Sequence, residues 1–250
     1  MKARPVVLLT LLLCASPLTA YEIDGSKWPG GETVFYSALG GFSNRLIRWN
    51  EAVLSSLEEW SNQTDFNFVV REEYRNPCVA DRFNSIDFTE DVCGSSFGSS
   101  TIAVTLSEFE QSVIGPPSIS SADIVVNENK VFEIFDGPLK PFLLGTVTNP
   151  LDLRRVVLHE LGHVIGLGHD DEVGAIMNSI IGDIDRLQED DIDGANALYG
   201  GLENCQVPQV YFGSSSDSLR AGDCTVRDLM VGGDDLSFID VRRLVLTEPI

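Results

Sequence analysis

The sequence is poor in basic residues, and beyond its first twenty positions it has no long hydrophobic run. Its 250 residues include 17 Lys and Arg against 38 Asp and Glu, a formal net charge of -21. Such an acidic chain repels nucleic acid and anionic lipid, so we expect neither as a partner. A membrane-spanning helix needs roughly 20 apolar residues, and no segment after residue 20 comes close. The charge alone says nothing about a reaction.

Residues 1–20 have the layout of a secretory signal peptide. Lys2 and Arg4 precede an apolar stretch of about a dozen residues, and small residues end the segment at Ala20. The segment is too short to cross a bilayer. We therefore expect cleavage near Ala20 and a soluble protein that is secreted, extracellular or periplasmic, without membrane contact afterwards. A monomer is the default expectation.

Cysteine is also scarce. The chain has five cysteines, of which one lies in the first twenty residues and four remain: Cys78, Cys93, Cys205 and Cys224. An even number of cysteines in an exported chain favours two disulfides, and four cysteines allow three pairings. The local pairs are preferred, Cys78 with Cys93 and Cys205 with Cys224. Free thiols are the alternative.

Short β-like runs and one amphipathic helix fill the first half of the chain. The helix is expected over residues 41–62, with an apolar stripe from Leu46 to Trp60 as part of the core. The expected strands are 32–39, 65–70, 84–88, 101–106 and 122–127. One strand, a helix and then several strands predict an α+β fold, a mixed sheet that carries a long helix on one face.

A second helix is predicted just before residue 166. Asn149 suits the N-cap, Pro150 the first helical position and Asp152 the first turn. Gly166 can end the helix, because a residue without Cβ readily takes the left-handed conformation.

All three histidines of the chain lie in the stretch HELGHVIGLGHD. His159 and His163 are four residues apart and project from the same side of a helix. The turn at Gly166 brings His169 back as a third nitrogen ligand, which leaves one tetrahedral position of a catalytic zinc ion open. Glu160 is placed to take a proton from a zinc-bound water and to pass it to the leaving amine. The alternative is a solvated histidine pair without a metal, since a bare HExxH often arises by chance.

The pattern H-E-x-x-H-x-x-G-x-x-H resembles the extended zinc signature of the metzincin endopeptidases at every defined position. Met177, eight residues after His169, resembles the Met-turn of that clan, and residues 186–200 look like the closing helix of the matrixin branch. The strands at 101–106 and 122–127 are also similar to that branch, so the resemblance covers residues 21–200.

The resemblance implies a metzincin-like twisted mixed sheet with a long zinc-binding helix. It also implies a zinc cleft between an upper subdomain and a smaller lower one that begins after Gly166. A peptide substrate would lie along the edge strand within residues 100–109, and the residues after Met177 would form a wall of the primary specificity pocket.

One departure from the family pattern restricts this expectation. Because the chain has no histidine outside the motif, the histidine-rich second zinc site of vertebrate matrixins cannot form, and we expect a single zinc ion. A calcium ion is a further alternative, but no ligands are assigned to it because no EF-hand spacing is present.

Residues 75–81, RNPCVAD, are superficially similar to the inhibitory propeptide segment of matrixins. They follow the first helix, so a disulfide at Cys78 is the better interpretation.

The sequence therefore predicts a matrixin-like zinc endopeptidase of secreted bacterial type, acting on protein or peptide substrates. The expected organisation is a signal peptide over 1–20, a catalytic domain over 21–200 and a small β-like C-terminal extension over 201–250. Two other classes stay open. One is a zinc hydrolase that acts on a non-protein amide such as a cell-wall crosslink, and the other is a catalytically silent protein-binding module.

Overall fold

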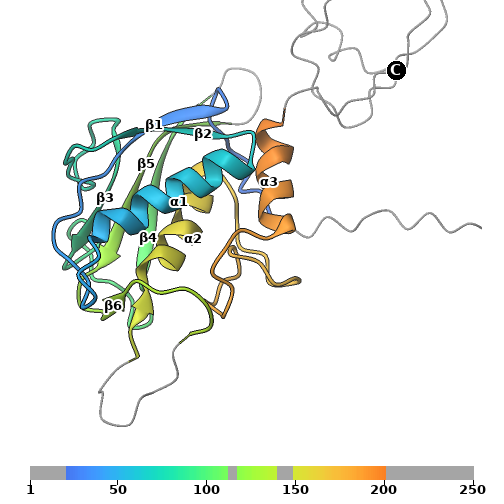
Figure 1. The fold of residues 1–250 in the computed structure, drawn as a ribbon. Helices are drawn as coiled ribbons and strands as arrows, with labels where there is room; N and C mark the ends of the chain where they lie inside the picture. Colours follow the sequence, from blue (N-terminus) through green and yellow to red (C-terminus); the bar gives the residue numbers. More distant parts are fainter. Residues whose placement is uncertain (1–20, 112–116, 140–148, 201–250) are drawn as a thin grey trace, which may run out of the picture.

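The computed structural model of the protein describes residues 21–111, 117–139 and 149–200 (Figure 1). The predicted signal peptide, the C-terminal extension and the Cys205–Cys224 pair lie outside the described residues. Within those ranges, no helix combines the length and the apolar character needed to span a bilayer.

A five-stranded mixed sheet forms the frame of the molecule. Its strand order is β2-β1-β3-β5-β4, and every neighbouring pair is parallel except β4 and β5, which are antiparallel. A separate short pair joins β6 to β7. The strands are β1 Glu32–Tyr36, β2 Asn67–Arg71, β3 Asn84–Thr89, β4 Ala103–Glu110, β5 Ser118–Asn127, β6 Phe132–Glu133 and β7 Leu151–Asp152.

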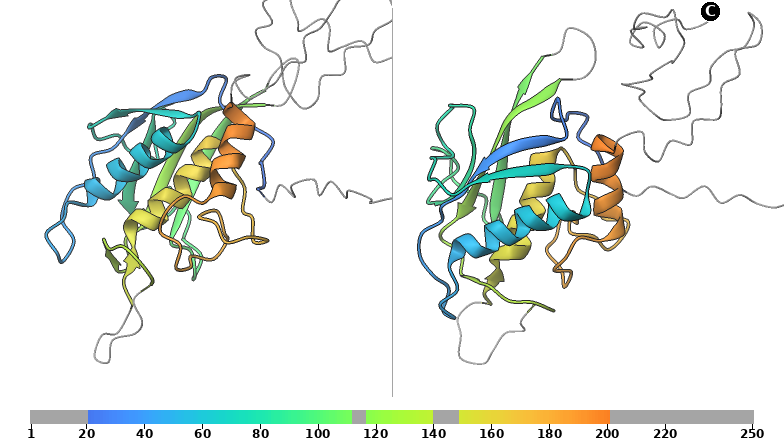
Figure 2. Two further views of the ribbon diagram at one scale, coloured as in Figure 1. Left: turned by 45° about the vertical axis from the view of Figure 1, so that its right-hand side comes forward. Right: turned by 45° about the horizontal axis from the view of Figure 1, so that its top comes forward.

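Three helices complete the described fold: α1 Trp49–Gln63, α2 Leu153–Ile165 and α3 Glu189–Tyr199. Helices α1 and α2 lie side by side on the same face of the sheet, and α3 stands next to the end of α2 (Figure 1 and Figure 2). The main core fills the space between this sheet face and the two helices. Trp60 is fully buried there, and its indole N–H donates to the carbonyl oxygen of Leu158 at 2.9 Å. The expected α+β, metzincin-like architecture is thus confirmed.

The prediction that the first helix spans residues 41–62 was wrong at its start. Helix α1 begins at Trp49, and Leu46 has a φ of 62° and a side chain that is 82% exposed, so it is not part of the core. The hydroxyl of Ser43 accepts a hydrogen bond from the Arg45 N–H, and the Ser43 N–H donates to the Ile47 carbonyl. These local bonds close a turn in place of the first helical turns.

The predicted cap of the second helix was also wrong. Asp152, not Asn149, caps α2 and accepts a hydrogen bond from the Arg155 N–H. Leu151 and Asp152 pair with Phe132 and Glu133 as strand β7, so the chain enters the helix directly from a strand. A pairing with a distant segment overrides the local signal of Asn149 and Pro150.

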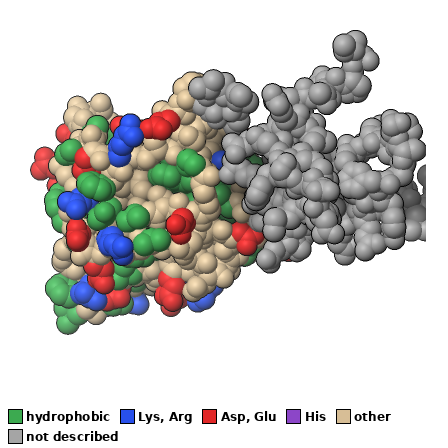
Figure 3. Space-filling view, turned by 90° about the horizontal axis from the view of Figure 1, so that it is seen from above, with side chains coloured by type: hydrophobic (Ala, Val, Ile, Leu, Met, Phe, Trp, Pro, Cys, Tyr) green, Lys and Arg blue, Asp and Glu red, His purple; other side chains and the backbone are tan. Residues whose placement is uncertain are grey.

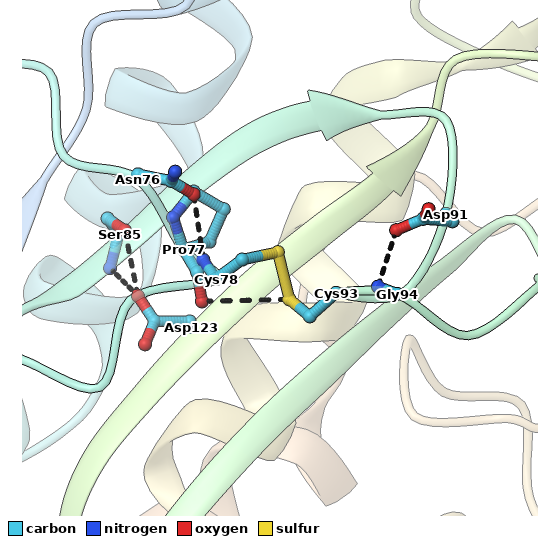
Figure 4. The surroundings of a disulfide bond; sticks show 8 residues. All are labelled: Asn76, Pro77, Cys78, Ser85, Asp91, Cys93, Gly94 and Asp123. Carbon is cyan, nitrogen blue, oxygen red and sulfur yellow. Dashed lines mark hydrogen bonds between the residues drawn. A yellow bond between two sulfur atoms is a disulfide. The ribbon is translucent and has the colours of Figure 1, made fainter.

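The Cys78–Cys93 disulfide is present, as predicted (Figure 4). It closes a loop with a sequence separation of 15 that contains the whole of β3. Cys78 is therefore occupied by a structural bond, which agrees with the interpretation of residues 75–81 as part of the folded domain.

Charged residues of both signs share the surface. On the face seen in Figure 3, acidic and basic side chains alternate with hydrophobic ones.

Candidate metal centre

Helix α2 carries the first part of the candidate site in its buried middle. His159 and Glu160 are only 8% and 7% exposed, although both are polar. Gly166 ends the helix with a φ of 101°, and a Cβ at this position would lie 2.5 Å from the carbonyl oxygen of Ser26. Glycine is therefore required both by the backbone conformation and by the close approach of the chain. The turn that follows brings His169 back towards the helix.

The three histidines meet at one point. The Nε2 atom of His169 lies 3.1 Å from Nε2 of His159 and 3.1 Å from Nε2 of His163. One nitrogen from each ring lies within 4.8 Å of the other two. Two nitrogen ligands at about 2.0–2.1 Å from a tetrahedral zinc ion are separated by about 3.3 Å. The observed spacing therefore fits zinc.

The tautomers also favour metal binding. Nδ1 of His159 donates to the carbonyl oxygen of Ile176 at 2.7 Å, and Nδ1 of His163 donates to that of Leu167 at 2.8 Å. Because these hydrogens are on Nδ1, the Nε2 lone pairs of both neutral rings point to the common centre. Burial lowers the pKa of both imidazoles, which keeps them neutral and able to bind a cation.

Glu160 lies next to this centre without belonging to the histidine cluster. Burial raises the pKa of its carboxyl group, whereas a hydrogen bond from Thr105 and the nearby imidazoles lower it. The Thr105 hydroxyl is 2.7 Å from Oε2 of Glu160 and 3.1 Å from the main-chain oxygen of Glu160. A cation held by the histidines would stabilise the carboxylate further. Thr105 was not predicted from the sequence, because a threonine is an ordinary residue in a strand that also holds other polar side chains.

Met177 packs under α2, in agreement with the predicted Met-turn. A Cβ on Gly162 would lie 2.1 Å from the sulfur of Met177, so the Met177 side chain would have to shift to make room for any larger residue. The carboxylate of Asp191 in α3 accepts hydrogen bonds from the N–H groups of Ile176 and Met177, each at 3.0 Å. The Ile176 carbonyl in turn holds His159. Asp191 was not predicted as a site residue, because an acidic residue in the first turn of a helix is usually explained as a capping residue.

Asp170 connects the third histidine to the same turn. Its side chain is buried, its N–H donates to the carbonyl oxygen of Met177 at 3.1 Å, and its carboxylate accepts from the Glu172 N–H at 2.7 Å. The segment that carries His169 is therefore anchored next to the Met-turn.

A small hollow lies beside His159. Three isoleucines of the segment after Met177 line it, together with Arg155: Ile180, Ile181 and Ile184. The guanidinium of Arg155 is buried and donates to the carbonyl oxygens of Gly182 and Gly137, each at 2.7 Å. The first of these bonds holds Gly182, which also lines the hollow and belongs to the segment that the resemblance assigned to a wall of the specificity pocket.

Strand β4 lies at the edge of the sheet and antiparallel to its neighbour, as expected for the 100–109 segment. The N–H of Asn127 donates to the carbonyl of Ile102 at 2.9 Å, and Ala103 pairs with Val126. In an antiparallel pair, residues whose main-chain groups face the partner alternate with residues whose groups face away. The N–H and C=O groups of Ala103 and Thr105 therefore face away from β5, towards an edge of the sheet that no other strand of the described residues covers.

The twisted mixed sheet, the glycine-ended helix and the three converging imidazoles define a zinc metallopeptidase domain of the metzincin class. Residues 43–200 match the sequence model of the family described as Matrixin, and the chain belongs to this family.

Individual relatives agree with this assignment. "Metalloendoproteinase 2-MMP" of Arabidopsis thaliana is 32% identical over 148 residues, which are 58% of this chain and 35% of that protein. "Interstitial collagenase" of Sus scrofa is 48% identical over 68 residues, 24% of this chain and 14% of that protein. "Metalloendoproteinase 1" of Glycine max is 47% identical over 57 residues, 22% of this chain and 19% of that protein. The chain thus spans about a third or less of the length of these relatives.

Proposed function

We propose that the protein is a secreted zinc-dependent endopeptidase that cleaves extended peptide segments next to His159, His163 and His169. The single observation that carries the proposal is the convergence of three Nε2 atoms beside the carboxylate of Glu160. Export is proposed from the signal-like composition of residues 1–20.

The three imidazoles would hold the metal, and Glu160 would move the proton. Zinc, when bound, polarises the substrate carbonyl and lowers the pKa of a coordinated water towards about 7. The carboxylate of Glu160 would take the proton from the attacking water and would deliver it to the nitrogen of the leaving amine. The burial of Glu160 excludes bulk water, which would otherwise compete for this proton.

The open edge of β4 would align the substrate. Main-chain groups of Ala103 and Thr105 point away from β5, so an extended peptide can add to the sheet as a further strand. Binding of this kind uses the peptide backbone and tolerates many sequences. An endopeptidase that cuts within unfolded chains needs this tolerance.

Selectivity would come from the hollow beside His159. Its isoleucines favour an apolar substrate side chain, and the buried guanidinium of Arg155, held by two carbonyls, limits the depth of the hollow. We propose that the protein prefers a small or medium apolar residue directly after the scissile bond. A cleavage-site profile on a peptide library tests this preference, and a preference for charged or large aromatic residues at that position would contradict it.

The decisive experiment compares the parent protein with Glu160→Gln on denatured casein, with and without a chelator. We expect the variant to keep one zinc ion per chain while its turnover falls by at least the order of 10²-fold expected on loss of a general base. The chelator should abolish parent activity, and added zinc should restore it. Near-normal turnover in Glu160→Gln contradicts the mechanism. Cleavage of purified peptidoglycan but not of casein would assign the protein to hydrolases of non-protein amides.

A further inference from the structure

Thr105 connects the two halves of the proposed site. Its main-chain groups face the open edge of β4, whereas its hydroxyl reaches across to Glu160 on α2. The two residues are 55 positions apart in the chain. A single residue therefore lies between the place where a peptide would pair and the group that would move the proton.

The direction of the Thr105 side chain follows from the register of the strand. Thr105 is opposite Ile124, which is fully buried in the core between the sheet and the helices. Side chains of directly paired residues project to the same face of a sheet, so Thr105 points to the face covered by α2. On that face, the Thr105 hydroxyl donates a hydrogen bond to Oε2 of Glu160, at 2.7 Å.

We propose that Thr105 is a positioning residue, whose hydroxyl holds the Glu160 carboxylate in the orientation needed for proton transfer. The proposal rests on the endopeptidase function proposed above. A buried carboxylate without a partner could rotate about its terminal torsion, which has a broad energy profile. One short hydrogen bond from a rigid strand removes this freedom.

The hydroxyl is suited to both forms of the glutamate. It carries one hydrogen and has two oxygens of Glu160 within reach, Oε2 at 2.7 Å and the main-chain oxygen at 3.1 Å. While Glu160 is a carboxylate, the hydroxyl donates to Oε2. Once the other carboxylate oxygen of Glu160 has accepted a proton, Oε2 still carries a lone pair, so the hydroxyl can keep donating to it. The side chain can thus keep one orientation throughout the proton transfer.

The test compares Thr105→Val, which keeps the shape but removes the hydroxyl, with Thr105→Ser, which keeps the hydroxyl. We expect Thr105→Val to lower kcat by about 10- to 100-fold, as for a misplaced catalytic group. KM should change by less than about 3-fold, since the main-chain groups that pair with substrate are retained. Zinc content should stay at one per chain, and Thr105→Ser should recover most of kcat.

Thr89→Val is the matched control. Thr89 is in β3, and its hydroxyl has no hydrogen-bond partner in the described part of the chain, so this variant should keep parental kcat. If Thr105→Val does not fold, Thr105→Ala replaces it with the same expectation. Unchanged kcat in the Thr105 variant overturns the inference, as does an equal loss in the Ser variant.

A double mutant separates positioning from a general structural effect. If Thr105 acts through Glu160, Thr105→Val should cost less than about 2-fold in kcat when Glu160 is already Gln. A loss that is as large in this background as in the parent would contradict the proposal. A parent protein that binds zinc but cleaves no peptide would overturn the proposed function, and this inference with it. An active parent with a fully active Thr105→Val variant overturns the inference alone.

Discussion

Gly162→Ala should destabilise the protein, although alanine is the better helix former. Gly162 lies in α2 between the first two histidines. A Cβ there would be 2.1 Å from Sδ and 3.0 Å from Cε of Met177, and 3.3 Å from a ring carbon of Trp60. The added methyl therefore enters occupied space on two sides.

Two opposing effects set the magnitude. Replacing glycine by alanine inside a helix is favourable by about 1 kcal/mol, whereas forcing a methyl group into a packed core costs about 1–3 kcal/mol. The repacking should be near the upper end, because Met177 is 3% exposed and Trp60 is fully buried, with its indole N–H held by the Leu158 carbonyl. We expect a net loss of about 1–2 kcal/mol, or roughly 2–8 °C in Tm for a domain of this size.

Urea unfolding of the zinc-free proteins measures this loss. Gly40→Ala is the control, since a Cβ at Gly40 meets nothing within 4 Å, and its stability should equal or slightly exceed that of the parent. In a Met177→Ala background the obstructing sulfur is gone, so Gly162→Ala should become neutral or stabilising. A Gly162→Ala variant more stable than the parent would refute the argument.

Three further predictions concern other contacts. Burial raises the pKa of Asp123 to about 7, so the folded protein holds this proton more tightly than the unfolded chain does. The free energy of unfolding should therefore fall as the pH rises from about 4 to about 7. In urea unfolding, Asp123→Asn should make this fall smaller. Parallel pH curves for parent and variant would contradict this. His163→Ala should lose zinc in metal analysis, and unchanged zinc affinity would remove it from the ligand set. Replacing Cys78 and Cys93 by Ser should lower the free energy of unfolding by about 3 kcal/mol, the chain-entropy value for a 15-residue loop. An unchanged unfolding midpoint would show that other contacts constrain the loop.

The parts of the fold that were predicted correctly depend on short-range patterns. The strands were recognised as short β-rich runs, and His159 and His163 were placed on one face of a helix because residues four apart share a helix face. Gly166 was recognised as the end of α2 from its conformational freedom alone, and its φ of 101° agrees. Local chemistry was sufficient for each of these features.

The errors and omissions share a different cause. The start of α2 was misplaced because Leu151 and Asp152 pair with a strand about twenty residues earlier. Leu46 was assigned to the core because its spacing fits a helix, whereas the turn closed by Ser43 and Ile47 displaces it into solvent. In both cases the deciding hydrogen bonds involve partners that a periodic pattern does not represent.

For the same reason, the histidine motif indicates only some of the residues that build the candidate site. The pattern in α2 identifies the candidate ligands and Glu160, but their orientations come from other elements. Asp191 in α3 holds the N–H groups of the Met-turn, and the turn holds His159 through the Ile176 carbonyl. From the opposite side, Thr105 in β4 holds Glu160.

Partners of this kind are difficult to recognise in a single sequence, because an acid at a helix start and a threonine in a strand are ordinary residues at those positions. Their importance depends on which residues lie next to them in space. Asp191 is 15 positions from Ile176 in the chain and Thr105 is 55 positions from Glu160, yet each pair is joined by a hydrogen bond. Each is linked to the motif by hydrogen bonds to buried groups, and such bonds are costly to leave unmade. A chain that kept the histidine motif but lacked these two side chains would therefore keep its candidate metal ligands, but His159 and Glu160 would be held less rigidly.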